Sequence, residues 1–141
     1  KEEKGYSSAW LHHKGRNRHH FEYWIDFSRT SQGIAGAKMP VNYLVEMVMD
    51  RIAACKVYRG KDYTDASAWE YYQRERPYLN SAMHTETKAE LEKILIMLKQ
   101  RGEKTTFSYL RKLLKKGNCK VFDNSDQIAW LFYRSCSMLC C

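Results

Sequence analysis

The segment that most constrains the fold runs from Pro40 to about Tyr58, because it is the longest and most apolar helical pattern in the chain. Proline is favoured at the first position of a helix, and the apolar residues that follow recur at helical spacing. They form one stripe and a second, alanine-rich face: Leu44, Met47, Val48, Ile52 and Cys55, then Ala53, Ala54 and Val57. A helix that is apolar nearly all round is usually buried. We therefore predict a helical protein built around this segment.

Two carboxylates interrupt this apolar surface. Glu46 and Asp50 are four residues apart, which places them one turn apart on the alanine-bearing side of the predicted helix. A buried carboxylate is costly unless it pairs with a cation or a metal ion. The pair is therefore either part of a cation-binding site or an ordinary pair of partly exposed acids. We take the first as a hypothesis and keep the second as its alternative.

A histidine-rich segment, WLHHKGRNRHHFEYW, precedes this helix and runs from Trp10 to Trp24. Four of the five histidines of the chain fall within nine residues of it: His12, His13, His19 and His20. Histidine is the commonest metal ligand and titrates nearest neutral pH. The aromatic residues around the imidazoles indicate that they lie at the edge of a core. We therefore predict a metal-binding or active site here, and a purely structural role for these histidines is the alternative.

The local pattern in this segment predicts two short helices. The first covers residues 6–13 and is capped by Ser7 or Ser8. Gly15 interrupts it, and Asn17 caps a second helix from Arg18 to Phe27. On a helix, His19 and His20 would point about 100° apart. We therefore expect one of them to bind metal while the other supports it or contacts substrate.

Further helices are predicted along the rest of the chain. After a loop over 29–39 and the central helix, they span 64–76, 85–102 and 106–116, and a last one begins at Ser125. Glycine (seven residues) and proline (two) are scarce, which favours helices over a turn-rich β architecture. We predict an all-α protein in which residues 1–141 form a single compact helical domain of about five to six helices.

Charge and cysteine content indicate partners and compartment. The net charge of +8 favours anionic partners, either phosphorylated small molecules or nucleic acid. No apolar run approaches the ~20 residues needed to span a bilayer, so we expect no membrane interaction. The five cysteines are odd in number and lack a zinc-ribbon spacing. They predict free thiols in a reducing, cytoplasmic setting, and they leave the Cys-rich C-terminus without a role.

Four motifs in order resemble an uncharacterised bacterial and phage family, domain of unknown function family 5662. They are AWLHHKGRNRHHFEYW, MPVNYLVEMVMD, YRGKDY and MHTETK. The resemblance covers roughly residues 6–100, and residues 103–141 are interpreted as a basic C-terminal extension. The motif order is also distantly similar to the HD-type metal-dependent phosphohydrolases, in which histidines and aspartates on several helices hold divalent metal ions.

This resemblance implies an HD-like bundle and a metal-dependent hydrolase acting on phosphorylated small molecules or nucleotides. His13, His19 or His20, and Asp50 would bind Mn²⁺, Fe²⁺, Co²⁺ or Zn²⁺. Glu46 would support these ligands or act as a base, and Asp50 would share the catalytic role. The residues that would bind the anion are Lys14, Arg16, Asn17, Lys61 and His84.

The chain departs from that pattern because it contains no His-Asp doublet. If the chain is a fragment, the N-terminal helices that carry the doublet lie upstream of Lys1. If it is complete, the comparison loses its central motif. The alternative function is a basic helical protein of phage origin that binds nucleic acid or has no catalytic role. The basic face of the helix over 106–116 supports the nucleic-acid alternative. The sequence does not predict an oligomeric state.

Overall fold

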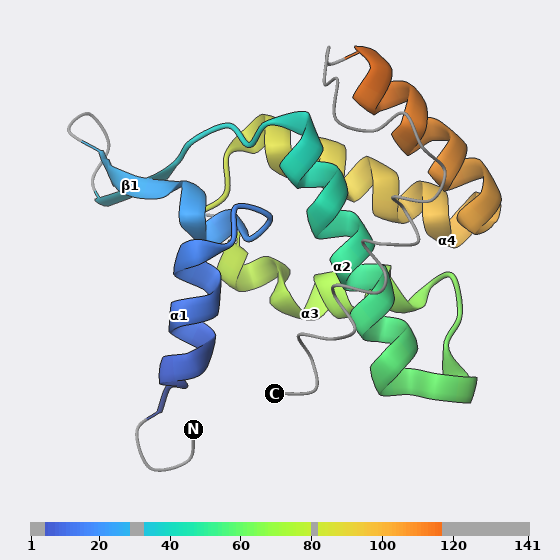
Figure 1. The fold of residues 1–141 in the computed structure, drawn as a ribbon, viewed down its shortest axis with the longest axis horizontal. Coiled ribbons are helices and arrows are strands. Elements are labelled where there is room, and N and C mark those ends of the chain that lie inside the picture. Colours follow the sequence, from blue (N-terminus) through green and yellow to red (C-terminus); the bar gives the residue numbers. More distant parts are fainter. Residues whose placement is uncertain (1–4, 29–32, 80–81, 117–141) are drawn as a thin grey trace.

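The structure is a computed structural model that describes residues 5–28, 33–79 and 82–116. Its elements follow one another along the chain, and Figure 1 shows their arrangement. They are α1 (Ser8–Arg16), the 3₁₀ helix η1 (Phe21–Trp24), β1 (Ile25–Ser28), β2 (Gly33–Gly36), α2 (Val41–Arg59), the 3₁₀ helix η2 (Gly60–Asp62), α3 (Ser67–Leu79) and α4 (Thr85–Lys116). Among the helices of this described part, none has the length and apolarity needed to cross a membrane.

The predicted apolar helix is the centre of the molecule. Pro40, predicted at the first helical position, is instead its N-cap, and α2 runs from Val41 to Arg59, close to the predicted range. All five residues of the predicted stripe are buried, and Val48 and Ile52 are fully so. Complete burial of such a side chain contributes roughly 1.5–3 kcal/mol. The cluster that they form therefore accounts for much of the stability of the fold.

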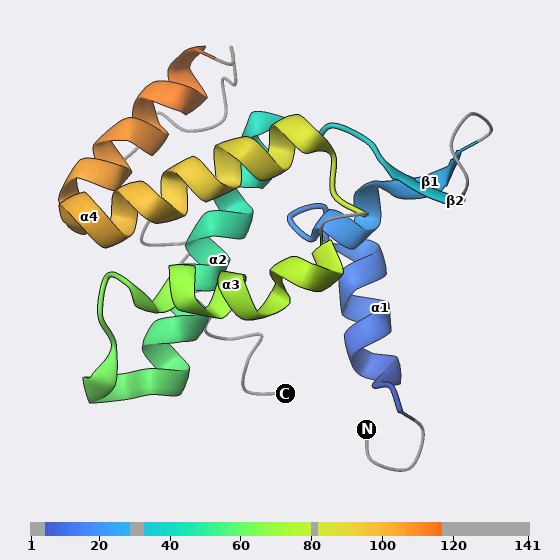
Figure 2. The same ribbon diagram turned by 180° about the vertical axis from the view of Figure 1, so that it is seen from behind.

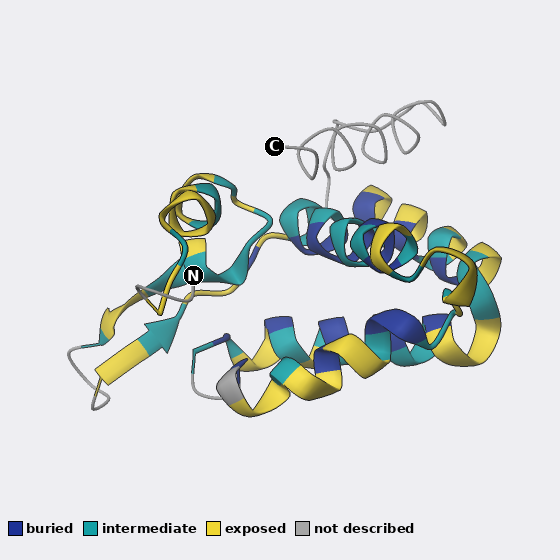
Figure 3. Ribbon diagram, turned by 90° about the horizontal axis from the view of Figure 1, so that it is seen from below, coloured by how far each residue is buried: buried dark blue, intermediate teal, exposed yellow. Residues whose placement is uncertain are grey.

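Helices α3 and α4 complete this core. Both cross the same side of α2 (Figure 2), and each contributes buried side chains, with Tyr72 from α3 and Leu91, Ile94, Leu95 and Leu98 from α4. The buried residues lie on the facing sides of these helices (Figure 3). The backbone N–H of Met39 donates to Oγ1 of Thr87 at 3.0 Å. This buried bond fixes the entry to α2 against the first turn of α4.

Glycine residues end or bend two of the helices. Gly60 has a φ of 53° and is the C-cap of α2. Gly102 has a φ of 75° inside α4, a conformation that glycine adopts without a steric cost. The predicted break at Gly102 is therefore present as a sharp kink between two helical parts (Figure 1). The hydroxyl of Thr106 donates to the carbonyl of Gly102 at 2.9 Å and supports the bend.

The predicted all-α, HD-like bundle of about five to six helices is wrong. The described residues contain four α-helices, two 3₁₀ helices and one small antiparallel sheet. In place of the predicted helix over 18–27 there are a turn, the 3₁₀ helix η1 and the first strand, β1. Ile25–Ser28 pairs with Gly33–Gly36, so that Phe27 lies opposite Ile34. Apolar and polar residues alternate around Ile25 and Phe27, and this pattern suits a strand. Residues 33–36, which we predicted as part of a loop, are extended and form its partner strand.

Gly36 is required by the packing of this hairpin. A Cβ at Gly36 would lie 2.6 Å from the backbone nitrogen of His84 and closer still to the carbonyl oxygen of Ala82. The second strand therefore rests directly on the backbone that leads into α4. The hairpin itself extends away from the helical core (Figure 1).

Helix α1 is attached to the rest of the molecule in a different way. None of its residues is buried, and it lies beside η1 at the end of the molecule that carries the hairpin (Figure 2). The predicted last helix after Ser125 and four of the five cysteines lie outside the described residues. Cys55 is buried in α2 as a free thiol.

Candidate metal centre

The first ligand candidate, His13, is placed by α1. The side chain of Ser7 accepts from the backbone N–H of Trp10 at 3.3 Å and caps the helix, as predicted. The helix continues through Gly15 to Arg16, and Asn17 is its C-cap rather than the start of another helix. His13 thus lies in the last turn, where its ring stacks on Trp10 with centroids 5.3 Å apart.

The second and third candidates, His19 and His20, lie in a turn. The backbone N–H of His20 donates to the carbonyl of Asn17 at 3.0 Å, and that of Tyr23 donates to His20 at 3.2 Å. The indole of Trp24 donates to the carbonyl of Arg18 at 2.8 Å and closes the segment. Because these residues are not helical, the predicted 100° separation does not apply. We expected only one of the two rings to bind an ion because we placed both residues on a helix, and that reason no longer holds.

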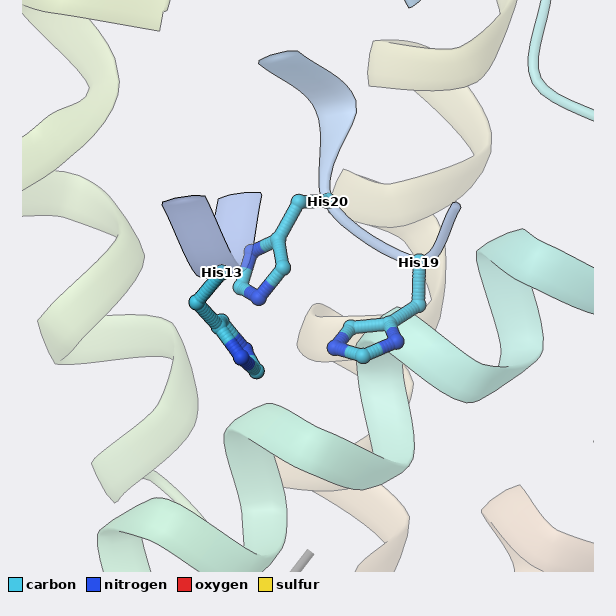
Figure 4. A group of neighbouring side chains, drawn as sticks. All are labelled: His13, His19 and His20. Atoms are coloured by element: carbon cyan, nitrogen blue, oxygen red, sulfur yellow. The ribbon is translucent and has the colours of Figure 1, made fainter. Parts of the chain in front are cut away.

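The three rings converge on one place (Figure 4). One potential ligand atom from each of His13, His19 and His20 lies within 4.8 Å of the others. The ring centroids of His19 and His20 are 4.4 Å apart, and those of His13 and His20 are 4.8 Å apart. Three imidazoles are the ligand set of open catalytic zinc sites.

The acidic side of α2 lies against this cluster. Nδ1 of His19 is 3.1 Å from Oε1 of Glu46, and the guanidinium of Arg18 donates to the hydroxyl of Tyr43 at 3.0 Å. Asp50, one turn after Glu46, interacts electrostatically with His13 and partly opposes the lowering of its pKa, whose largest cause is burial. The segment that carries the histidines and the acids of the central helix therefore share one site.

Burial keeps two of the rings, His13 and His20, neutral. Desolvation is the main cause that lowers the pKa of His20 to about 3, and the neighbouring charges of His19 and His13 add to it. Desolvation also lowers the pKa of His13, followed by the effect of His19. Neutral imidazole is the form that binds metal. His13 and His20 are thus in the neutral form at neutral pH.

Two ring nitrogens in the cluster lack a partner. Nε2 of His19 and Nε2 of His20 are buried without a hydrogen bond, as are Oε2 of Glu22 and Nε of Arg51. Each such group costs roughly 1–3 kcal/mol when it stays unsatisfied. Buried polar atoms that gather at one place indicate a missing ligand, ion or water. A cation between the rings would satisfy both nitrogens at once.

The residues predicted to bind the anion are placed unevenly. Lys14 lies at the cluster, where it pairs with Glu22 and lowers the pKa of His20. Arg16 is exposed at the end of α1. The amide of Asn17 donates to Nδ1 of His13 at 3.1 Å and to its carbonyl at 2.8 Å, so it supports a ring instead of facing substrate.

Lys61 and His84 lie elsewhere. Lys61 is exposed in η2, at the opposite end of α2 from the histidine cluster (Figure 1). His84 precedes α4, where its Nδ1 accepts from the backbone N–H of Glu86 at 3.2 Å. It packs beside Phe21, Trp24 and Gly36. The structure therefore does not bring either residue to the three rings.

Three residues at the site were missed by the sequence predictions. Trp10 covers His13, and its position three residues earlier on a helix is a signal that predicts the contact. Arg51 is one of the charges that lower the pKa of His20, while its guanidinium pairs with Glu75 at 2.8 Å. Glu22 pairs with Lys14. Neither of these two could be found by local spacing, because their partners depend on tertiary packing.

The described residues define a mostly helical protein in which an N-terminal histidine cluster is packed against the acidic side of a central helix. Residues 1–97 match the model of DUF5662, a family of unknown function, and the chain belongs to this family. No curated protein and no solved structure shows significant similarity to the chain. The family description assigns no activity, so the function has to be argued from the site itself.

Proposed function

We propose that this protein is a metal-dependent hydrolase of phosphorylated small molecules or nucleotides. A divalent ion (Mn²⁺, Fe²⁺, Co²⁺ or Zn²⁺) would be held by His13, His19 and His20. The observation that carries the proposal is the convergence of three ring nitrogens within 4.8 Å, two of the rings having a buried and unpartnered Nε2. The proposal stands on this site and does not require an HD-type bundle.

The surrounding residues suit hydrolysis of a phosphate ester. Three imidazoles leave coordination positions open for water and substrate. When bound, the ion would lower the pKa of water and polarise a phosphoryl oxygen. Asp50 interacts with the cluster from α2 and is the candidate to take the proton from the attacking water. The water oxygen forms a bond to phosphorus, the ester P–O bond breaks, and the departing alcohol takes up a proton.

Positive charge beside the rings supports an anionic substrate. Lys14 and Arg51 both lower the pKa of His20, so both place positive potential at the cluster. With the ion bound, this potential would stabilise the charge that develops on the phosphoryl group. Imidazole ligands with a neighbouring carboxylate suit the transition metals named above better than Mg²⁺ or Ca²⁺.

Metal binding is tested first. The protein is purified without chelators and its metal content is measured by mass spectrometry, then it is stripped and titrated with Zn²⁺, Co²⁺ and Mn²⁺. We expect one ion per chain, and we expect the triple variant His13→Ala/His19→Ala/His20→Ala to lose it. His12→Ala is the matched control, because His12 is an exposed neighbour outside the cluster. A wild-type chain that binds none of the three metals would contradict the proposal.

Hydrolysis is tested next with the metal-loaded protein. Generic phosphomonoester and phosphodiester probes that release nitrophenol, and a panel of nucleotides, are the substrates. Asp50→Asn should reduce turnover by about 10²–10⁴-fold if Asp50 accepts the proton of water, while metal content is retained. If the loaded protein hydrolyses none of the probes and Asp50→Asn changes nothing, the metal site is structural.

A further inference from the structure

Two of the three rings of the cluster are held by neighbours of different chemistry. His19 faces Glu46 of α2, and His13 faces the amide of Asn17 at the end of its own helix. A carboxylate can only accept a hydrogen bond, whereas the nitrogen of an amide can only donate one. The two neighbours therefore impose opposite proton positions on the two rings.

Glu46 leaves His19 ready to bind a cation. Because Oε1 of Glu46 accepts from Nδ1 at 3.1 Å, the proton of the neutral ring lies on Nδ1. Nε2 then carries a lone pair, and this atom is buried without a partner. The side chain of His19 is only 12% exposed, so water does not replace the missing partner freely. A carboxylate behind a ligating histidine is the arrangement that orients such rings in metal sites.

Asn17 has the contrary effect on His13. Its amide nitrogen donates one hydrogen to the carbonyl of His13 at 2.8 Å and the other to Nδ1 at 3.1 Å. The first bond fixes the orientation of the amide, since a flipped amide would place its oxygen against that carbonyl. Nδ1 of His13 is thus an occupied acceptor, and the ring proton lies on Nε2. Neither nitrogen of His13 can bind an ion until this amide turns away or flips.

We propose that Glu46 and Asn17 are positioning residues that make the three histidines unequal ligands. Glu46 makes His19 the anchoring ligand, and Asn17 makes His13 the ligand that joins last and leaves first. This inference rests on the proposed metal site and specifies how its occupancy is controlled. It also separates Glu46 from the reacting atoms, so that Glu46 acts through His19 rather than as a base.

Two variants test the inference because it predicts opposite effects. In Glu46→Gln the new amide can donate to Nδ1 of His19 and move the ring proton to Nε2, so the Zn²⁺ and Co²⁺ dissociation constants should rise about 10–100-fold. In Asn17→Ala the competitor for His13 is removed, so the dissociation constants should fall several-fold. Glu86→Gln is the matched control, because Glu86 is an exposed carboxylate that pairs with Lys38 and with none of the three rings.

The proton positions are measured separately by ¹⁵N NMR of the imidazole rings in the metal-free protein. We expect His19 protonated at Nδ1 and His13 at Nε2, with the His19 proton moved to Nε2 in Glu46→Gln.

The inference alone is overturned if wild type binds metal but both variants shift the dissociation constant in the same direction, or if the NMR tautomers are reversed. If wild type binds no metal, the proposed function is wrong and the inference falls with it. Circular dichroism melts of each metal-free variant confirm that the fold is kept.

Discussion

At the scale of single residues, the surroundings of His20 keep this ring uncharged. His20 is surrounded by two other imidazoles and by Lys14 and Arg51, and burial has already lowered its pKa to about 3. Trp10 covers the edge of this ring at 5.7 Å and stacks on His13. A protonated His20 would therefore lose hydration and gain no anionic partner in its immediate surroundings.

This arrangement predicts an acid-dependent loss of stability in the metal-free protein. The pKa of His20 is about 3 in the folded chain and near 6.5 in the unfolded one, so between these values the unfolded chain binds a proton that the folded chain does not. The contribution of His20 to the free energy of unfolding is fully present above pH 6.5 and is lost progressively as the pH falls toward 3. After allowance for solvent screening of a ring that is not fully buried, the loss is about 2–3 kcal/mol.

Denaturant unfolding at a series of pH values measures this loss. His20→Phe keeps an aromatic ring without a titrating group and should flatten the dependence between pH 6.5 and 5, a range in which most carboxylates stay ionised. If the free energy of unfolding changes with pH equally in wild type and His20→Phe over that range, His20 does not contribute to the acid-dependent loss of stability.

At the scale of elements, the hairpin and α1 depend on different interactions. The hairpin exposes Phe27 and Ile34 on one face, with Phe27 85% exposed, and it is fixed at its inner end by Gly36. The backbone N–H of Ala37 also donates to the carbonyl of Trp24 at 2.7 Å. Helix α1 is held instead by the rings of the cluster and by the Lys14–Glu22 ion pair.

Gly36→Ala should destabilise the protein by about 1–3 kcal/mol, as overpacking generally does. Its new Cβ would overlap the backbone between Ala82 and His84, which cannot move without shifting the start of α4. Gly15→Ala is the matched control, because nothing lies within 4 Å of its Cβ and alanine is the better helix former by about 1 kcal/mol. The melting temperature should therefore fall in Gly36→Ala and rise in Gly15→Ala. An unchanged melting temperature in Gly36→Ala would contradict the close approach of Gly36 to the backbone of Ala82 and His84.

Metal should order α1. A helix of nine residues without a buried side chain is marginal in water by itself, and His13 is the ligand that it contributes to the cluster. Hydrogen exchange of the α1 amides should therefore slow when Zn²⁺ is added, while the amides of α2 should stay unchanged. His13→Ala should abolish the effect and His12→Ala should keep it. Exchange in α1 that is the same with and without bound metal would contradict this coupling.

At the scale of the whole molecule, the core and the site are built on the same helix. Helix α2 buries Leu44, Val48 and Ile52 on the side that meets α3 and α4, and it presents Glu46 to His19 on another. The exposed basic residues of the second half of α4 lie at the end of the molecule away from the cluster (Figure 1). The nucleic-acid alternative rests on those residues and stays a prediction.

Metal binding should also raise the stability of the whole protein. An ion that binds only the folded chain contributes about 2.7 kcal/mol at one hundred times its dissociation constant. The melting temperature should rise with Zn²⁺ concentration for wild type, and for the variant His13→Ala/His19→Ala/His20→Ala it should not change. An equal rise in both proteins would show that Zn²⁺ binds elsewhere, for example at the cysteines.

Much of the helical part could be predicted from local sequence. The Pro40 start, the apolar stripe of α2, the Ser7 cap and the break at Gly102 all depend on residues close together in the chain, and all are present. The hairpin could not be predicted in this way. Its strands are short, and the spacing of His20 and Trp24 is also compatible with one turn of a helix. Only the partner strand, which the local sequence does not reveal, decides between the two.

The sequence by itself determined the central helix, its two carboxylates and the concentration of histidines before it, since side-chain type and spacing are local properties. Only the tertiary structure decided that His13, His19 and His20 share one place, that Glu46 meets His19 and that Asn17 meets His13. The physical reason is that the chain turns after Asn17 rather than continuing as a helix. That turn is stabilised by contacts to Tyr43 and Glu46 on α2, more than twenty residues away.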